Sequence, residues 1–342
     1  GGGAVSLGGT SLVIATSNDA VVLGAVTLGA NTTINTNASD TTGDITIGAV
    51  TGGSNTLTLT TENNISNADI TASGAISGVT TLTLASVGGT ATLSGDVDVT
   101  TLSVDNTVAN VAFTGNGSSV TNAVSFANDG TLTLGTSGGT QTYNAGLTTT
   151  SVGSTVTLNG TIATSNDAVV LGAVTLGSAT TVDTNASSNA GDITVAAITG
   201  GSNNLTLSTG DNISGADITA SGAISGLGNL TLADVGGTAT FSANVAVAAL
   251  SADSTAANIT FTGSSNTFSA ASTLANDGTL TFGNSTDDSF TFNGGLTTSS
   301  VGGTVTLNTN ISSSDDALTF GAITLVTMSP LILIQRLLTE QT

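Results

Sequence analysis

Pairs of aspartates in polar, glycine-containing stretches are the groups in this chain best suited to chemistry. Asp96 and Asp98 fall on one face of an expected strand, and Asp40 with Asp44 falls in an expected loop. Carboxylate oxygens are the ligands that Ca²⁺ prefers. The glycine-rich nonapeptide of calcium-binding β-rolls is missing, so the alternative is a set of solvated turn residues that cap strands and keep the protein soluble. The weak calcium candidates are Asp96, Asp98, Asp287, Asp288, Asp315 and Asp316. No other cofactor is expected.

Catalysis by paired carboxylates, as in glycoside hydrolysis, is the competing interpretation of these aspartates. A site that cleaves an acidic polysaccharide also needs cationic groups and aromatic faces. Residues 1–325 contain no basic side chain, and Tyr143 and most of the nine phenylalanines fall in strand-like stretches typical of a core. We therefore expect no catalytic residue and no enzyme activity.

The composition excludes several classes of function. The sequence has no Cys, His or Lys, which removes disulfides, thiolate or imidazole metal sites, serine–histidine triads and the P-loop lysine. The net charge is −21 with a single Arg, so the chain cannot neutralise a run of phosphates, and no nucleic-acid partner is expected. The sequence contains no unbroken apolar run long enough to predict a membrane-spanning helix.

A long internal repeat dominates the sequence. The segment Ala15 to Leu28 recurs unchanged as Ala163 to Leu176, and Ala68 to Gly78 recurs at the same offset as Ala216 to Gly226. The repeat predicts the following organisation: the end of a preceding repeat (1–13), long repeat 1 (14–161), long repeat 2 (162–310), the start of repeat 3 (311–325) and an atypical tail (326–342).

Within each long repeat, short stretches alternate apolar residues with threonine. Examples are Thr56–Leu59, Thr81–Leu84, Thr131–Leu134 and Thr155–Leu158. This alternation predicts half-buried strands, and the Gly-, Asn- and Asp-rich clusters between them predict turns. The strand spacing of about 20–25 residues matches one coil of a β-solenoid. We therefore expect an all-β fold, a parallel β-helix of stacked coils.

The expected coil has a narrow core of Val, Leu, Ile and Ala, with Thr, Ser and Asn facing outward. Large aromatic residues are not expected to fit this core, and glycine is expected at the corners. The alternative is a tandem of two β-sandwiches. Sandwiches usually contain large core aromatics and loop prolines, whereas aromatics make up 3% of this sequence and its only proline is Pro330.

The tail, residues 326–342, differs from the rest, because the only Met, Pro and Arg of the chain lie there. A short hydrophobic helix and a docking tail are two explanations. A third is a reading-frame slip. Codons chosen for Thr327 to Ile334, displaced by one base, encode Asn-Val-Thr-Ile-Asp-Thr-Asp, which resembles the repeat segments Asn31–Asn37 and Ala179–Asn185.

Several stretches resemble the repeat regions of filamentous haemagglutinin-like proteins, giant bacterial adhesins of the two-partner and autotransporter type. They are Gly24–Gly29, Gly43–Ile47, Gly52–Leu59 and Gly191–Val195. The resemblance covers residues 4–325. This segment does not contain the Asn-Pro motifs of the family's secretion domain. It implies a right-handed parallel β-helix shaft that is exported to the bacterial cell surface or secreted, and that serves adhesion or an extracellular fibre.

The expected role is a stiff, extracellular structural segment. Neither residue 1 nor residues 310–325 carries an evident polar cap, so the chain either continues or associates end to end with copies of itself. A host-surface or matrix ligand is the other expected partner. The alternatives are a self-assembling S-layer or matrix subunit that depends on Ca²⁺, and an ice-binding solenoid, which a regular threonine file on one flat face would favour.

Overall fold

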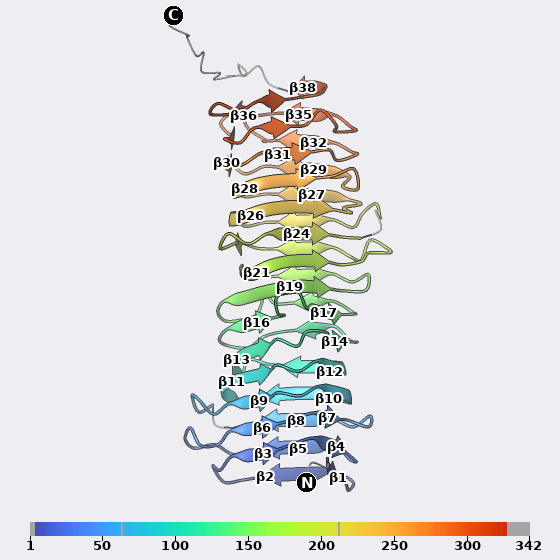
Figure 1. The fold of residues 1–342 in the computed structure, drawn as a ribbon, viewed down its shortest axis with the longest axis vertical. Coiled ribbons are helices and arrows are strands. Elements are labelled where there is room, and N and C mark those ends of the chain that lie inside the picture. Colours follow the sequence, from blue (N-terminus) through green and yellow to red (C-terminus); the bar gives the residue numbers. More distant parts are fainter. Residues whose placement is uncertain (1–3, 63, 211–212, 327–342) are drawn as a thin grey trace, which may run out of the picture. The chain divides into compact units, whose positions relative to one another are not determined.

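The computed structural model describes residues 4–62, 64–210 and 213–326 and forms strands, with no helix, in that part of the chain (Figure 1). Two compact units divide between Val174 and Thr175. In each unit the chain winds in coils, and equivalent strands of successive coils pair in parallel. This is a β-solenoid of the parallel β-helix type, as the alternating pattern predicts. No helix of the described residues could cross a membrane.

Unit 1 contains three stacks of parallel strands. The first consists of β1 (Val5–Leu7), β4 (Val26–Leu28), β7 (Val50–Thr51), the starts of β10 (Ile76–Ala85) and β12 (Val97–Val104), then β14 (Ser119–Val120), β17 (Thr140–Tyr143) and the end of β19 (Val156–Ala163). The second consists of β2 (Leu12–Ala15), β5 (Thr32–Asn35), β8 (Leu57–Thr60), the ends of β10 and β12, then β15 (Val124–Ser125), β18 (Leu147–Thr148) and β20 (Val169–Leu171). The third consists of β3 (Val21–Leu23), β6 (Ile45–Ile47), β9 (Ile70–Ala72), β11 (Val87–Leu93), β13 (Val108–Phe113), β16 (Leu132–Leu134) and the start of β19.

Unit 2 has the same design. One stack consists of β23 (Ile198–Thr199), the starts of β26 (Ile224–Ala233) and β28 (Val245–Ala252), then β30 (Ser265–Phe268), β33 (Ser289–Phe292) and β36 (Asn310–Ser312). A second consists of the end of β21 (Val174–Asp183), β24 (Leu205–Ser208), the ends of β26 and β28, then β31 (Ser272–Leu274), β34 (Leu296–Thr297) and β37 (Leu318–Thr319). The third consists of β22 (Ile193–Val195), β25 (Ile218–Ala220), β27 (Thr238–Phe241), β29 (Asn258–Phe261), β32 (Leu280–Phe282), β35 (Val305–Leu307) and β38 (Ile323–Leu325).

The length of one coil follows from the pairing register. Leu12 aligns with Thr32 at one of the shortest coils, whereas Val50 aligns with Ile76 at a longer one. These offsets agree with the coil length that the strand spacing predicts. The repeat boundaries, 14–161 and 162–310, are defined by the sequence alone. The predicted tail lies outside the described residues except for Val326, which is exposed.

The strands alternate between the core and the surface. In β11 (Val87–Leu93) the four odd-numbered residues are buried and the three between them are half-buried. Ile34, Leu59 and Leu84 align in three successive coils and are at most 1% exposed. Because each inward residue packs on its equivalent in the next coil, the core is a continuous ladder of aliphatic side chains.

The expectation that large aromatics would not fit the core is wrong. Tyr143 and eight of the nine phenylalanines are fully buried. In unit 2, Phe241, Phe261 and Phe282 align in register, and their rings stack with centroids 4.9 and 5.7 Å apart. Rings fit a narrow core because strand stacking at about 4.8 Å places flat side chains face to face along the axis.

Unit 1 carries a polar pair in its core. The Tyr143 hydroxyl donates to Gln141 Oε1 at 2.9 Å, and Gln141 Nε2 donates to the Phe113 carbonyl at 2.8 Å. Burial raises the pKa of Tyr143 well above its usual range, so the ring stays a neutral donor. Repeat 2 has Phe290 and Phe292 at the equivalent positions, both fully buried.

The ring stack of unit 2 yields a stability prediction. We expect Phe261→Ala to lower the free energy of unfolding by about 3–5 kcal/mol, because it leaves a cavity between two stacked rings. The matched control is Phe241→Leu, which introduces the residue that repeat 1 has at Leu93 and should cost below about 1.5 kcal/mol. Denaturant unfolding followed by circular dichroism measures both. Equal losses for the two variants would contradict the stacking account.

Candidate functional site

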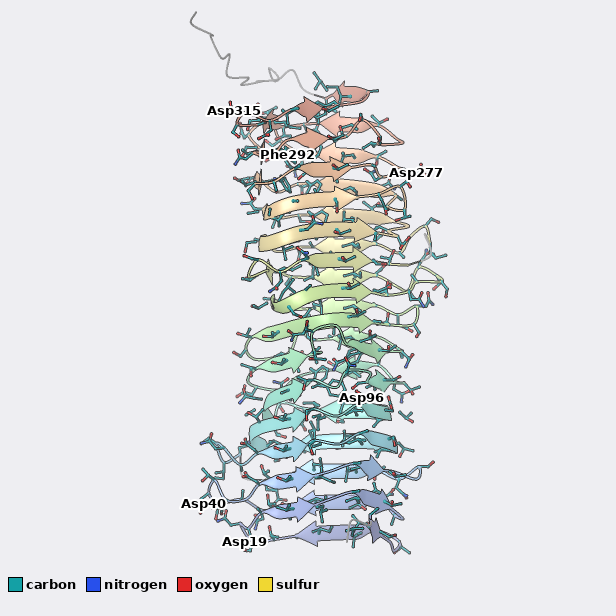
Figure 2. All side chains as sticks on the ribbon, viewed as in Figure 1. Asp19, Asp40, Asp96, Asp277, Phe292 and Asp315 are labelled. Atoms are coloured by element: carbon teal, nitrogen blue, oxygen red, sulfur yellow. The ribbon has the colours of Figure 1, made fainter. Side chains whose placement is uncertain are left out.

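The predicted calcium candidates lie at strand starts and coil corners that are distant from one another in the chain. Among residues 4–62, 64–210 and 213–326, no three acidic side chains gather in an arrangement that could hold a metal ion. Figure 2 shows Asp40 and Asp315 on loops at the edge of the coils, whereas Phe292 lies inside. Calcium takes six to eight oxygen ligands, so each candidate pair would need several further ligands.

Asp96 and Asp98 have different surroundings despite their short separation. Asp96 is half-buried, and its Oδ1 accepts a hydrogen bond from the Gly117 amide at 2.8 Å in the next coil. Asp98 is exposed on β12, and its carboxylate has no hydrogen-bond partner among the described residues. Repeat 2 has Asn244 and Ala246 at the equivalent positions, so this carboxylate pair belongs to repeat 1 alone.

Of the two predicted pairs in the C-terminal half, only the Asp288 carboxylate has a structural role among the described residues. Asp288 is 5% exposed, and its Oδ2 accepts from the amides of Asn284 at 2.8 Å and Ser285 at 3.0 Å, which closes a turn. Its neighbour Asp287 is exposed. Asp315 and Asp316 are also exposed, and the Asp316 amide donates to Ser313 Oγ at 3.0 Å.

A ladder of side chains that cap the next coil gives the capping alternative its residues, which sequence reasoning did not identify. Asp44 Oδ1 accepts from the Asp69 amide at 2.9 Å, and Asp69 Oδ1 accepts from the Thr90 amide at 2.7 Å. Unit 2 repeats the arrangement from Asp192 to the Asp217 amide at 2.8 Å and from Asp217 to the Thr238 amide at 2.7 Å. These aspartates therefore bind protein backbone, one coil onward.

Asparagine performs the same task at other coils. Asn110 Oδ1 accepts from both the amide and the hydroxyl of Thr131, at 2.9 and 3.0 Å. Asn258 does the same for Thr279 in unit 2, with both contacts at 2.9 Å. An oxygen acceptor is thus what the position requires, and the negative charge is not. The signal in the sequence is the motif Asp-Ile-Thr, which begins at Asp44, Asp69, Asp192 and Asp217.

The loop around Asp40 is a separate acidic turn. Asp40 Oδ1 accepts from the Thr42 hydroxyl at 2.7 Å and from the Thr42 amide at 2.9 Å. These hydrogen bonds, with a smaller contribution from Asn18, hold the pKa of the Asp40 carboxyl below its usual value. The predicted proximity of Asp40 and Asp44 does not produce a shared site, because Asp44 caps the next coil instead.

Outward threonines form files along the stacks. In unit 2 one file is uninterrupted over seven coils, and it consists of Thr194, Thr219, Thr240, Thr260, Thr281, Thr306 and Thr324. The equivalent file of unit 1 is broken by Ala112. The other two stacks of unit 2 also carry outward Thr and Ser. Those two stacks are interrupted by residues such as Ala246 and Ser251, so the file of seven threonines is the feature that the ice-binding alternative predicts. Threonine is also common in strands of any function.

A comparison of the chain with protein-family models, curated proteins and solved structures found no match. The geometry of the candidate sites assigns the carboxylates of Asp44, Asp69 and Asp96 to backbone capping. Asp98 is one of several exposed aspartates, with Asp19 and Asp277, whose carboxylates have no partner in the described part of the chain.

The capping ladder yields a second prediction. Asp69→Ala should destabilise the protein by about 1 kcal/mol, because the Thr90 amide loses its acceptor. Asp69→Asn keeps an oxygen at this position, as Asn110 does naturally, and should stay within about 0.5 kcal/mol of the parent. Denaturant midpoints measure the difference. Similar losses in both variants would mean that the charge, and not the acceptor, matters.

The Asp40 turn yields a pH prediction. The folded pKa of Asp40 is depressed, so its contribution to the loop is present above the ordinary carboxyl range and is lost as pH falls through the lowered pKa. Thr42→Val removes the hydroxyl donor and should raise the Asp40 pKa toward its usual value, which moves the loss to higher pH. An NMR titration of the Asp40 carboxyl carbon measures both proteins. An unchanged pKa in the variant would refute the assignment.

Proposed function

We propose that this chain is a shaft segment of a secreted or cell-surface fibrous adhesin of a bacterium. The observation that carries the proposal is the unbroken parallel register of the coils within each unit. Every coil is bonded to the one before and the one after it, from β1 to β19 in unit 1 and from β23 to β36 in unit 2. The function is mechanical and does not require a catalytic group.

The bonding pattern explains how such a segment would resist load. In a β-solenoid the interstrand hydrogen bonds run along the stacking direction, so a pull along that direction is shared by all the stacks of a unit. The capping ladder adds side-chain bonds in the same direction, for example from the Asp69 amide to Asp44 and from the Thr90 amide to Asp69. The aliphatic and aromatic core adds continuous packing between coils.

The surface chemistry supports an extracellular setting. Twenty-two acidic residues and one basic residue give a net charge of −21, and self-repulsion of this size keeps a long apolar-rich solenoid from lateral association. The resemblance of residues 4–325 to filamentous haemagglutinin-like repeats supports the same setting. The described residues contain no Lys or Arg, so they offer no cationic surface for nucleic acid.

Immunogold electron microscopy of intact source cells tests the proposal. An antibody raised against the exposed loop around Asp40 should label fibres outside the cell envelope without permeabilisation, and deletion of the coding region should remove both label and fibres. An antibody against a cytoplasmic protein serves as the permeability control. Label that appears only after permeabilisation would overturn the proposal.

A further inference from the structure

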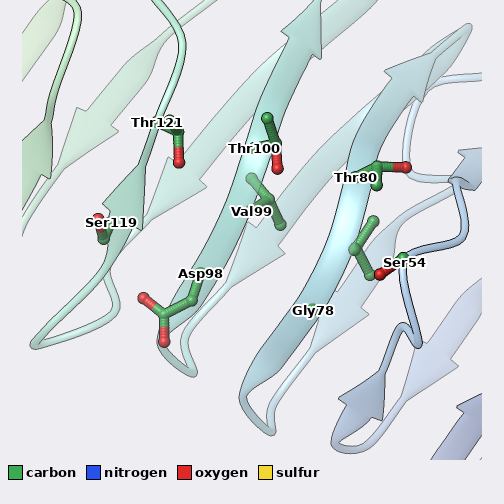
Figure 3. Close-up of a pocket in the computed structure, with 9 residues that line it drawn as sticks. Ser54, Gly78, Thr80, Asp98, Val99, Thr100, Ser119 and Thr121 are labelled. Carbon is green, nitrogen blue, oxygen red and sulfur yellow. The ribbon is translucent and has the colours of Figure 1, made fainter.

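A groove lies at the starts of strands β10 and β12 and crosses four successive coils of unit 1. We call it the bulge groove. It is lined by Ser54, Gly78, Val79, Thr80, Asp98, Val99, Thr100, Ser119 and Thr121 (Figure 3). Successive coils are about 4.8 Å apart, so the groove offers about 14 Å of length along the stack. That length suits a short extended peptide segment.

A β-bulge produces this groove. The register between β10 and β12 shifts between Ser77 and Val79, and the inserted Gly78 has a left-handed φ of 66°. Only glycine adopts this conformation without strain. The floor is firm, because Val79 and Val99 are 1% and 4% exposed. The Thr80 amide donates to the Asn55 carbonyl at 2.9 Å, which fixes one wall.

Unit 2 has the same groove on the same backbone. Its register shifts between Ser225 and Leu227, and Gly226 has a φ of 68°. The lining is Ser202, Gly226, Leu227, Ala246, Val247, Ala248, Thr267 and Ser269. The equivalents of Asp98 and Thr100 are Ala246 and Ala248, and the equivalent of Thr80 is Gly228. The two repeats therefore share the shape of the groove and differ in its polar groups.

The polar groups of the unit 1 groove suit an ammonium ion. Asp98 supplies an exposed carboxylate without a partner among the described residues at one end of the groove, and Thr80, Thr100 and Thr121 form a row of hydroxyls across successive coils (Figure 3). A lysine ammonium has three donors and no acceptor, so it pairs with the Asp98 carboxylate, and the row of hydroxyls offers hydrogen bonds to the backbone of the same extended segment. Ca²⁺ needs six to eight oxygens and would find a single carboxylate here.

We propose that the bulge groove of unit 1 binds a lysine side chain of an extended segment of a partner protein. The net charge of −21 attracts a cationic partner, and no described residue of this chain carries a positive side chain that could fill the groove instead. The groove of unit 2, which lacks the carboxylate and two of the hydroxyls, does not bind it. This site adds recognition to the mechanical role and is independent of it.

Fluorescence anisotropy with a labelled, end-blocked tetralysine peptide tests the proposal on the full chain at about 0.15 M salt, where long-range attraction is screened. The double variant Asp98→Ala, Thr100→Ala gives the groove the residues that unit 2 has naturally, so the backbone tolerates it. We expect affinity to fall about tenfold. Asp19→Ala removes the same charge from an exposed site outside the groove and should change affinity less than twofold.

A gain-of-function variant completes the test. Ala246→Asp with Ala248→Thr should install a second site and raise the stoichiometry from one peptide to two. Equal losses in the Asp98 and Asp19 variants would overturn the proposal, since binding would then follow charge alone. Unchanged binding of an acetyl-lysine peptide, or Ca²⁺ binding that Asp98→Ala abolishes, would also overturn it. These measurements use purified protein, so their failure leaves the fibre proposal standing.

Discussion

The pairing of each coil with its neighbours is the constraint on which the rest of this structure depends. A strand as short as β6 (Ile45–Ile47) has no stability alone, and it exists because β3 and β9 bond it from both sides. Every inward side chain must then match its equivalent in the next coil, and every corner must return the chain to the same register. The aliphatic ladder, the caps and the glycine corners are consequences of that single requirement.

The capping ladder also limits the repulsion between stacked carboxylates along one column of each unit. Stacked carboxylates about 4.8 Å apart repel each other, which would destabilise a continuous aspartate column. In unit 1 the column contains Asp44 and Asp69 and then continues with Thr90, Asn110 and Thr131, which are neutral. Each aspartate further directs one oxygen to a backbone amide. Negative charge in this column is thus confined to two successive coils, and the neutral Asn110 continues the capping.

The sequence predicts the strands well because their signal is local. The alternating stretch Thr56–Leu59 corresponds to β8 (Leu57–Thr60), and Thr155–Leu158 corresponds to the start of β19 (Val156–Ala163). The caps cannot be derived in the same way. Coil length varies from one coil to the next, so the sequence alone does not show that Asp44 lies beneath Asp69. The strand-like stretches around most phenylalanines already indicate burial, but the stacking of the rings cannot be derived from sequence, because it depends on Phe241, Phe261 and Phe282 sharing one register.

Near-identical repeats create a register problem that the core helps to solve. Long stretches such as Ala15–Leu28 and Ala163–Leu176 are interchangeable by sequence, so the residues of these stretches do not distinguish the coils of one repeat from those of the other. Buried residues outside them do. Placing the strand that carries Gln141 and Tyr143 into unit 2 would replace the Phe290 ring, which packs edge-on against Phe261 and Phe282, with a polar amide. The reverse exchange would force two phenyl rings into space shaped for a hydrogen-bonded pair. The core differences between the repeats therefore separate the native register from one in which the two repeats are exchanged.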